Sequence, residues 1–322
     1  MAAEPELLPQ VLVLRPKPRL EQALSARFHL LKPWESTMPL DRFVAAHAAA
    51  VRAVISTGLA AVDAPLIRAL PFLGFVFTTS VGVEHIDLAE CARRGIAVTN
   101  AGAIFSRDVA DYAVGLLVDV LLRVSASDRY VRRGSWPVAG DFPPRCKLGG
   151  KRVGIVGLGS IGSEIAKRLE AFGCSISYFS RNKKPLFPYT YFPTVGDLAA
   201  KSDVLVVACA LTEETHHIID KDVMLALGKD GIIINVGRGP LVDEAELVKH
   251  LVQGKIGGAG LDVYEREPAV PEELLRMDNV VLSSHVAVFT IESSDDLVEL
   301  AMENLEAFFS NRPLLTPVHG TT

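Results

Sequence analysis

Short apolar runs alternate with helical patterns along the chain, and the alternation occurs in two successive sets. The runs of the first set cover residues 11–14, 28–31, 53–57, 75–79 and 97–99. Those of the second set cover residues 153–156, 176–179, 204–208, 232–236, 258–261 and 280–282. Between the runs, apolar residues recur at helical spacing, for example in residues 40–50 and 64–70. Such alternation is typical of parallel sheets, so the sequence predicts two α/β domains, each with a doubly wound parallel sheet.

The two sets are joined by a long helical pattern over residues 107–132 and a glycine- and proline-rich stretch over residues 134–150, which predicts a loop. A last amphipathic pattern, residues 292–310, follows the second set. Because it has no partner left in the second sheet, we expect it to pack on the first domain. The sequence therefore predicts a discontinuous first domain, residues 1–105 plus 287–322, with a second domain, residues 106–286, inserted in it. The cleft between two such domains is a common location for a small-molecule site.

Composition narrows the class of protein. The chain has 322 residues, 49% hydrophobic and 22% charged, and its net charge of −5 disfavours a nucleic-acid or anionic-membrane partner. No apolar run approaches the roughly 18 residues of a membrane span. The acidic N-terminal segment lacks a signal-peptide core and the last residues are not a peroxisomal tripeptide, so we expect a cytoplasmic protein. The four scattered cysteines indicate a reducing compartment, no structural disulfide and no metal cluster.

The most informative motif is the segment 151–165, KRVGIVGLGSIGSEI. An apolar run leads into Gly157-x-Gly159-x-x-Gly162, and a helical pattern follows. In the dinucleotide-binding fingerprint the first glycine permits a sharp turn, the second lets the backbone approach a pyrophosphate, and the third lets the helix pack close to the strand. The helix N-terminus then offers free N–H groups to the phosphates. We interpret the segment as the dinucleotide site of a Rossmann domain; a structural glycine turn is the alternative.

The residues after the next strand indicate which dinucleotide binds. An acidic residue about 20 positions beyond the glycines usually binds the ribose hydroxyls of NAD. Here positions 180–184 read Ser-Arg-Asn-Lys-Lys, without Asp or Glu. The guanidinium of Arg181 suits bidentate binding of a phosphate, and Ser180 and Asn182 add a hydroxyl and an amide. The pattern predicts a 2′-phosphate site, and hence NADP(H) preferred over NAD(H). A solvated basic loop in an NAD enzyme is the alternative.

Chemically active residues follow the last three runs of the second set. Arg238 follows the fourth run, Asp262 and Glu267 follow the fifth, and His285 follows the sixth. In an open α/β sheet, ligands bind outside the carboxyl ends of the strands. We therefore expect Arg238, Glu267 and His285 to converge on the face that holds a nicotinamide.

Six segments together give the chain a resemblance to a known family. In chain order they are SVGVEHIDL, DVADYAVGLL, YVRRGSW, GLGSIG, YFSRNKK and LDVYEREP. With these motifs the chain resembles the D-isomer-specific 2-hydroxyacid dehydrogenases over nearly its whole length, and most closely the branch of plant-type glyoxylate/hydroxypyruvate reductases and hydroxyphenylpyruvate reductases. The resemblance implies a Rossmann domain inserted in a discontinuous flavodoxin-like substrate domain. It also implies NADPH-dependent reduction of small 2-oxo acids, namely hydroxypyruvate and glyoxylate, with hydroxyphenylpyruvate as a further candidate.

The resemblance also implies a role for individual residues. Arg238 would pair with the substrate carboxylate and polarise the carbonyl, while His285 would protonate the carbonyl oxygen as hydride arrives. Glu267 would orient the imidazole and favour the imidazolium. The substrate carboxylate would be bound by the backbone N–H groups of Val81, Gly82 and Val83, and no metal is implied. Asp262 would orient the nicotinamide carboxamide. The implied cofactor contacts are Gly157, Leu158, Gly159, Ser160, Ile161, Gly162, Ser180, Arg181, Asn182, Val236, Gly237, Arg238, Asp262 and His285.

Each of these roles has a structural alternative. The side chain of Arg238, in a Gly-Arg-Gly turn, could cap a helix. Glu265 could be mistaken for Glu267, although the position of Glu267 just before a proline favours it. His285 is one of eight histidines, and a lone histidine after a strand is often structural.

Three further features remain to be placed. After the histidine that corresponds to His285, relatives often carry small residues. Positions 287–289 here are Ala-Val-Phe, which could reshape the pocket or, for the phenylalanine, belong to the core. Trp136 lies in a region that forms the dimer interface in the family, so we expect a homodimer through the long helix and the loop around Trp136. The alternative is a tryptophan that covers its own domain's core. The adjacent His216 and His217 have no partner pattern and are interpreted as surface or cofactor-edge residues.

Two other functions share the same motifs. An NAD-linked dehydrogenase of the phosphoglycerate type is disfavoured by the basic segment 180–184. A non-catalytic, dinucleotide-sensing binding protein, resembling the C-terminal-binding-protein corepressors, would keep the same arginine, glutamate and histidine. The NADP-type segment 180–184 disfavours that alternative too, and steady-state turnover would decide between it and an enzyme.

Overall fold

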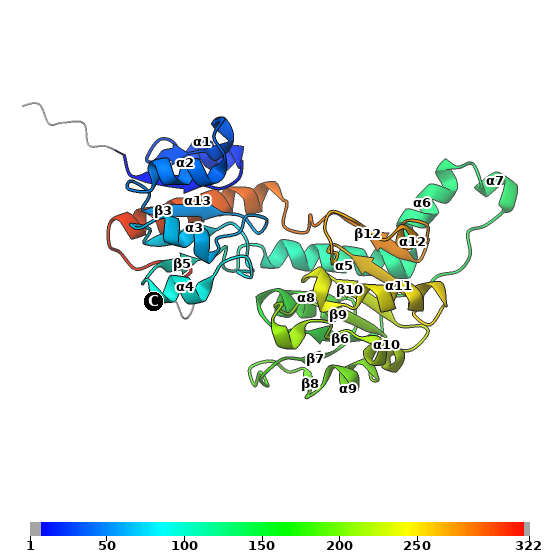
Figure 1. Cartoon of the computed structure of the whole chain (residues 1–322). Helices are drawn as coiled ribbons and strands as arrows, with labels where there is room; N and C mark the ends of the chain where they lie inside the picture. The colour runs from blue at the N-terminus through cyan, green and yellow to red at the C-terminus, as the bar shows by residue number, and fades with distance from the viewer. Residues whose placement is uncertain (1–7, 319–322) are drawn as a thin grey trace, which may run out of the picture. The chain divides into compact units, whose positions relative to one another are not determined.

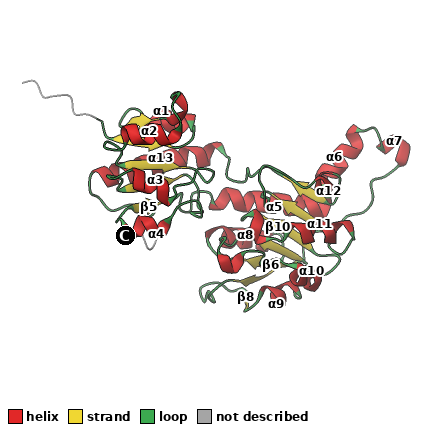
Figure 2. Ribbon diagram, in the orientation of Figure 1, coloured by secondary structure: helices red, strands yellow, loops and turns green. Residues whose placement is uncertain are grey.

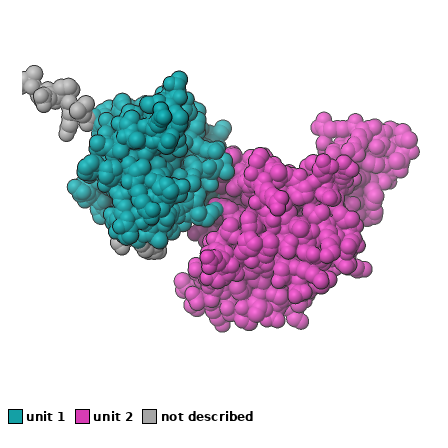
Figure 3. Space-filling model, in the orientation of Figure 1, with its two compact units in different colours: residues 1–105, 290–322 teal, residues 106–289 magenta. Residues whose placement is uncertain are grey.

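The computed structural model describes residues 8–318 and divides into two compact units. Unit 1 comprises residues 1–105 and 290–322, and unit 2 comprises residues 106–289 (Figure 3). The predicted fold class, one parallel-sheet domain inserted in another that is discontinuous, is confirmed. The two chain ends on which the expectation of a cytoplasmic protein rests, residues 1–7 and 319–322, lie outside the described residues.

Unit 1 is built on a parallel sheet, whose strands are yellow in Figure 2. Its strand order is β2-β1-β3-β4-β5. This is the flavodoxin-like order, in which the strand sequence reverses beside the first strand. Strands β3 and β4 are buried along their whole length, as expected for a sheet covered on both faces. The strands are β1 (Gln10–Val13), β2 (His29–Leu31), β3 (Ala53–Ser56), β4 (Phe75–Thr78) and β5 (Ala97–Thr99).

The last helix of the chain packs on this first sheet, although all of unit 2 intervenes in the sequence (Figure 1). Its amphipathic pattern buries Leu297, Ala301 and Leu305. The ring of Phe308 stacks on Phe75 of β4 with centroids 5.0 Å apart. The helices of unit 1 are α1 (Pro18–Leu24), α2 (Leu40–His47), α3 (Ala64–Ala69), α4 (Leu88–Arg93) and α13 (Ile291–Phe309), with a 3-10 turn η1 (Pro33–Glu35).

Unit 2 contains a seven-stranded parallel sheet in the order β12-β11-β10-β9-β6-β7-β8. Counted from β6, this is the Rossmann order 3-2-1-4-5-6 with β12 added at one edge. The strands are β6 (Arg152–Val156), β7 (Ser175–Phe179), β8 (Thr190–Phe192), β9 (Val204–Val207), β10 (Ile232–Asn235), β11 (Gly258–Leu261) and β12 (Val280–Leu282).

The helices of unit 2 cover its sheet, and α5 packs along α8 and against β10 and β11. The helices are α5 (Ser106–Leu122), α6 (Val124–Arg132), α7 (Trp136–Ala139), α8 (Ser160–Ala171), α9 (Val195–Ala199), α10 (Lys221–Leu227), α11 (Glu244–Val252) and α12 (Glu272–Leu275). Two 3-10 turns, η2 (Glu213–Thr215) and η3 (Gly239–Leu241), follow β9 and β10.

The structure corrects the predicted sheet at one place. Six strands were predicted from apolar runs, but β8 is a further strand that pairs with β7, with Tyr191 opposite Tyr178. None of its three residues is fully buried, so it carries no apolar run. The third to sixth predicted strands are therefore the fourth to seventh strands of the sheet along the chain.

The prediction of one long helix over residues 107–132 is wrong. Helix α5 ends at Leu122, Arg123 has a left-handed φ of 52°, and α6 follows. The carboxylate of Asp119 accepts hydrogen bonds from the backbone N–H and the hydroxyl of Ser125, and these bonds hold the break. Helix α7 interrupts the stretch that was predicted as a loop. We call residues 124–139, which extend from the rest of unit 2 in Figure 1, the α6–α7 arm.

Candidate active site

The glycine turn after β6 fits the dinucleotide fingerprint at each of its three glycines. Gly157 has a φ of 100°, and a Cβ there would lie 2.6 Å from the backbone of Cys209. A Cβ at Gly162 would lie 2.0 Å from the carbonyl oxygen of Gly157, so only glycine lets α8 approach the strand this closely. A Cβ at Gly159 would meet nothing within 4 Å, which leaves open space where a phosphate would approach.

Helix α8 begins at Ser160, directly after this turn. Within residues 8–318, the backbone N–H groups of Ser160 and Ile161 donate no hydrogen bond. The first N–H groups of a helix lack intrahelical partners and, together with the helix dipole, attract anions. The turn and the helix start therefore have both the space and the donors that a pyrophosphate requires.

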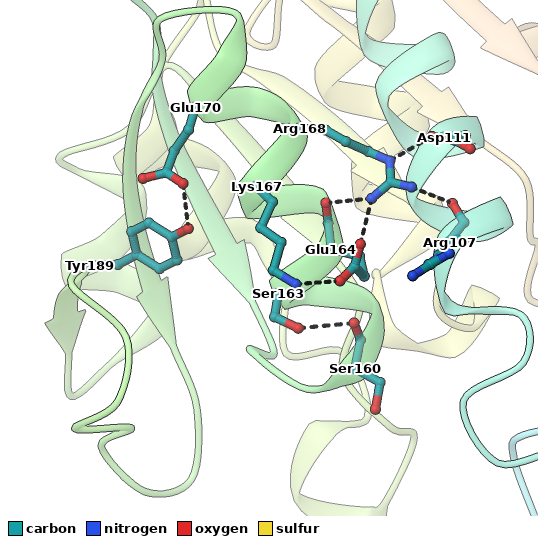
Figure 4. Close-up of polar contacts among 9 residues, drawn as sticks. All are labelled: Arg107, Asp111, Ser160, Ser163, Glu164, Lys167, Arg168, Glu170 and Tyr189. Atoms are coloured by element: carbon teal, nitrogen blue, oxygen red, sulfur yellow. Dashed lines mark hydrogen bonds and ion pairs between the residues drawn. The ribbon is translucent and has the colours of Figure 1, made fainter.

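Ion pairs and hydrogen bonds hold α8 against its neighbours (Figure 4). Arg168 donates to Asp111 of α5 at 2.5 Å and to Glu164 of α8 at 2.8 Å. The hydroxyl of Tyr189, the residue before β8, donates to Glu170 at 2.8 Å. The helix that presents free N–H groups at its start is thus fixed both to α5 and to the connection between β7 and β8.

The basic segment after β7 is ordered by local hydrogen bonds. The hydroxyl of Ser180 donates to the carbonyl oxygen of Asn182 at 2.6 Å. The hydroxyl oxygen of the buried Tyr178 accepts a hydrogen bond from the backbone N–H of Lys184 at 2.7 Å. Arg181 is exposed, and its guanidinium forms no hydrogen bond or ion pair with another described residue. Its charge helps to lower the pKa of the exposed Glu214, and the guanidinium can still donate hydrogen bonds to a phosphate.

His285 and Glu267 form a hydrogen-bonded pair at the carboxyl ends of β12 and β11. The Nδ1 atom of His285 lies 2.8 Å from Oε2 of Glu267, and the backbone N–H of Tyr264 donates to Oε1 at 3.1 Å. Burial raises the pKa of Glu267, but the hydrogen bond and charge of His285, the Tyr264 N–H and the charge of Arg238 bring that pKa below its usual value. The carboxylate is therefore ionised at neutral pH, and its hydrogen bond orients the imidazole. Nε2 of His285 has no hydrogen bond to a described residue.

Arg238 follows β10 and starts the turn η3. Its backbone carbonyl accepts a hydrogen bond from the side chain of Asn235 at 2.9 Å, and its guanidinium donates to the carbonyl of Gly237 at 2.8 Å. The side chain makes no capping hydrogen bond to η3. The charge of Arg238 and the hydrogen bond and charge of His285 both lower the pKa of Glu267. The structure therefore brings the arginine, the glutamate and the histidine to one site.

Asp262 holds the backbone that carries His285, a function that the sequence pattern does not reveal. The side chain is 1% exposed. Its carboxylate accepts hydrogen bonds from the hydroxyl of Ser283 at 2.6 Å and from the N–H groups of Val286 at 2.9 Å and Ala287 at 3.1 Å. Its carbonyl oxygen accepts from the N–H of His285, which has a left-handed φ of 56°. The contact with a nicotinamide carboxamide implied by the resemblance stays a prediction.

In unit 1, the loop after β4 offers a row of free donors. Within residues 8–318, the N–H groups of Val81, Gly82 and Val83 donate no hydrogen bond. Their carbonyls are held instead: Asn100 donates to the carbonyl of Val81 at 2.7 Å, and Ser80 donates to that of Gly82 at 2.7 Å. Consecutive free N–H groups form an anion-binding concavity, which suits a carboxylate.

Three interpretations from the sequence change with the structure. Phe289 is 63% exposed, so the alternative that it belongs to the core is wrong. Trp136 is 57% exposed and donates to Asp141 at 3.3 Å, so it does not cover the core of its own unit. His217 does have a partner, because its Nε2 lies 2.7 Å from Oε1 of Glu265. The two glutamates of the loop are thereby told apart: Glu265 pairs with His217, and the other pairs with His285.

The part of the chain that the structure describes contains no group of three or more histidine, cysteine or acidic side chains placed to hold a metal ion. The four cysteines are free. None of the described helices is both long and apolar enough to span a membrane.

Comparison with known proteins identifies the family. The model of the family described as D-isomer specific 2-hydroxyacid dehydrogenase, NAD binding domain, matches residues 114–287. The chain belongs to the D-isomer-specific 2-hydroxyacid dehydrogenase family. It is 55% identical over 314 residues to a glyoxylate/hydroxypyruvate reductase of Arabidopsis thaliana, covering 96% of this chain and 97% of that protein. It is 53% identical over 300 residues to a hydroxyphenylpyruvate reductase of Plectranthus scutellarioides, covering 93% and 95%.

A solved structure of this 2-hydroxyacid dehydrogenase family extends the comparison to three dimensions. An NADPH-dependent glyoxylate/hydroxypyruvate reductase of Sinorhizobium meliloti, in complex with NADP and malonate, matches this chain with a TM-score of 0.91 at 39% identity and 97% coverage of both chains. The resemblance predicted from sequence motifs is confirmed. As a member of the family, the chain is an NAD(P)-dependent oxidoreductase.

Proposed function

We propose that this dehydrogenase reduces small 2-oxo acids to D-2-hydroxy acids, or glyoxylate to glycolate, with NADPH as the preferred cofactor. The observation that carries the proposal is the His285–Glu267 pair beside Arg238, at the carboxyl ends of strands in the unit that also holds the glycine turn. Relatives named for reduction of glyoxylate, hydroxypyruvate and hydroxyphenylpyruvate support this substrate class. In this proposal unit 2 binds the dinucleotide, and unit 1 contributes to binding the oxo acid.

The residues can carry out each step that the reaction needs. When bound, NADPH supplies the hydride. Arg238 pairs with the substrate carboxylate and polarises the 2-oxo group. His285, as imidazolium, donates its Nε2 proton to the carbonyl oxygen, and the Glu267 carboxylate stabilises that charged state and fixes the ring by its bond to Nδ1. The free N–H groups of Val81–Val83 provide further donors for the carboxylate. In the reverse direction, neutral His285 accepts the proton.

A panel of oxo acids tests this function. Oxidation of NADPH is followed with hydroxypyruvate, glyoxylate and hydroxyphenylpyruvate in parallel, and 3-phosphohydroxypyruvate with NADH represents the phosphoglycerate-type alternative. We expect turnover with at least one of the first three. Turnover only with the phosphorylated acid and NADH would favour the alternative dehydrogenase. Tight NADPH binding without turnover on any acid would favour a dinucleotide-sensing protein of the same fold.

The preference for NADPH is proposed to depend on Arg181, with Ser180 and Asn182 as further ligands of the 2′-phosphate. In the variant Arg181→Asp, a charge-assisted contact is replaced by repulsion, so the ratio of kcat/KM for NADPH to that for NADH should fall about 100-fold. The matched control is Lys255→Asp, which reverses an exposed charge in the turn before β11. An unchanged ratio in the Arg181 variant would refute the phosphate site.

The α6–α7 arm is proposed to form a homodimer interface together with α5. Apolar side chains lie exposed along it: Val124, Val131, Trp136 and Val138, the last at 88%. Such residues are stabilised by burial against a second copy. We expect the wild-type protein to sediment as a dimer and the variant Val138→Asp to shift it toward monomer, whereas Val252→Asp, on an exposed apolar residue of α11, leaves it unchanged. A monomeric wild type would contradict this interface.

We also propose that the protein resides in the cytoplasm, because its four free cysteines suit a reducing compartment. Fractionation of cells that express the tagged full-length chain tests this proposal. Recovery with an organelle marker would contradict it.

A further inference from the structure

The loop that carries Glu267 also carries a second glutamate–histidine pair, which the proposed chemistry does not use. Two residues before Glu267, Glu265 lies 2.7 Å through Oε1 from Nε2 of His217. Both side chains are partly buried, with exposed fractions of 34% for His217 and 25% for Glu265. The pair therefore joins the segment after β9 to the segment after β11.

The backbone of His217 makes a second connection, to the segment after β10. Its N–H donates to the carbonyl of Pro240 at 2.8 Å, two residues after Arg238. The next residues continue along the same segment, because the N–H of Ile219 donates to the carbonyl of Leu241 and Asp243 N–H donates back to Ile219. His217 itself has a left-handed φ of 51°, which a non-glycine residue adopts at a cost.

The segments after β10 and β11 also touch each other directly. A Cβ at Gly239 would lie 1.9 Å from the carbonyl carbon of Tyr264 and 2.4 Å from the backbone N of Glu265. No side chain separates the two backbones there. Arg238 directly precedes Gly239, and the N–H of Tyr264 donates to Glu267. A shift of the contact between Gly239 and Tyr264 would therefore move both the arginine and the glutamate.

Charged groups surround the pair on several elements. Oε1 of Glu265 also accepts a hydrogen bond from the backbone N–H of Glu244 at 3.2 Å, at the start of α11. The carboxylate of Asp243 lies 3.9 Å from Nδ1 of His217, and the ring of His216 lies against that of His217 with centroids 4.0 Å apart. Carboxylates on two segments thus face one imidazole, which favours a strong hydrogen bond to Glu265.

We infer that His217 is a positioning residue for the reduction: by its bonds to Pro240 and Glu265 it holds the Arg238 segment against the Glu267 loop, and so sets the spacing of the arginine from the histidine–glutamate pair. The inference rests on the proposed function for its kinetic consequence. The structural link that His217 makes between the two loops does not depend on that function.

The test combines kinetics with amide hydrogen exchange on the full-length protein. In His217→Ala, kcat/KM for the best oxo acid of the panel should fall about tenfold, with kcat lowered and KM raised, because both a binding and a proton-transfer group lose alignment. NADPH affinity should change less than twofold. The amides of Arg238, Gly239 and Leu241 and those of residues 264–267 should exchange faster than in the wild type. Rescue is expected in His217→Gln, whose amide N–H can still donate to Glu265.

Two controls separate positioning from general destabilisation. His47→Ala removes a histidine ring that packs on Phe43 in unit 1, and should change neither the exchange of these loops nor kcat/KM. In a double-mutant cycle, His217→Ala combined with Glu265→Ala should cost less than the sum of the two single changes, because both remove the same His217–Glu265 bond.

The possible outcomes distinguish a failure of the positioning role from a failure of the proposed function. Unchanged exchange of both loops in His217→Ala, or additive losses in the double mutant, would overturn the positioning role even if the enzyme reduces oxo acids. Faster exchange of both loops in His217→Ala, together with a wild type that reduces no oxo acid, would support the connection and reject the proposed function.

Discussion

Replacing His285 with alanine should lower kcat for reduction of the oxo acid by about 10²- to 10⁴-fold, the usual contribution of general acid catalysis. The Nε2 atom has no hydrogen bond to a described residue, while Nδ1 is held by Glu267 at 2.8 Å, so the ring is oriented for proton transfer. The variant removes the proton donor and leaves the glycine turn intact. Its affinity for NADPH, measured by fluorescence titration, should stay within about twofold of the wild type.

Glu267→Gln is a milder change, made at the hydrogen-bond partner of His285. It keeps a side chain of the same size beside the imidazole but removes the negative charge, so its loss of kcat should be smaller than that of His285→Ala. Full activity of His285→Ala would reject the histidine as general acid. A loss of NADPH binding in parallel with kcat would instead assign it to the cofactor site.

Arg238→Ala should raise KM for the oxo acid and lower kcat together, with kcat/KM falling about 10²- to 10³-fold, because one guanidinium both binds the carboxylate and polarises the carbonyl. The backbone of the residue is held independently, by the Asn235 side chain at its carbonyl oxygen, so the turn should keep its shape. Initial-rate kinetics over a range of oxo acid concentrations, at saturating NADPH, measure both constants.

The matched control for this arginine is Arg238→Lys. It keeps the positive charge but cannot make a bidentate contact, so it should recover part of kcat and little of KM. A fall in kcat alone, with KM unchanged in both variants, would contradict the proposed binding of the carboxylate. It would leave Arg238 with an electrostatic effect on Glu267, whose pKa it helps to lower.

The sequence predicts most of the fold because its strands are buried on both faces. Continuous apolar runs mark β3, β4, β9 and β10, and the glycine fingerprint identifies β6 and α8. Strand β8 carries no such run, because it lies at the sheet edge and is only partly buried. The break at Arg123 could not be predicted for another reason. Helical spacing continues through it, and periodicity does not show the hydrogen bonds from Ser125 to Asp119 that hold the turn.

Part of the candidate site could likewise be predicted from the sequence, and part of it could not. Residues that directly follow strands, such as Arg238 and His285, could be proposed from the rule that ligands bind at the carboxyl ends of parallel strands. The supporting bonds of Asp262 to the 283–287 backbone could not, since they depend on the path of a loop after another strand. His217 has no recognisable spacing to Glu265, 48 positions away. Such contacts form only when several loops meet at one sheet edge.

The most direct test of the central claim is the initial rate of cofactor oxidation by the wild-type protein with hydroxypyruvate, measured with NADPH and with NADH under the same conditions. The account predicts clear turnover with NADPH and a kcat/KM for NADPH that exceeds that for NADH at least about tenfold, given the charge of Arg181 and the absence of an acidic residue after β7. Turnover that is equal with the two cofactors, or faster with NADH, would contradict it.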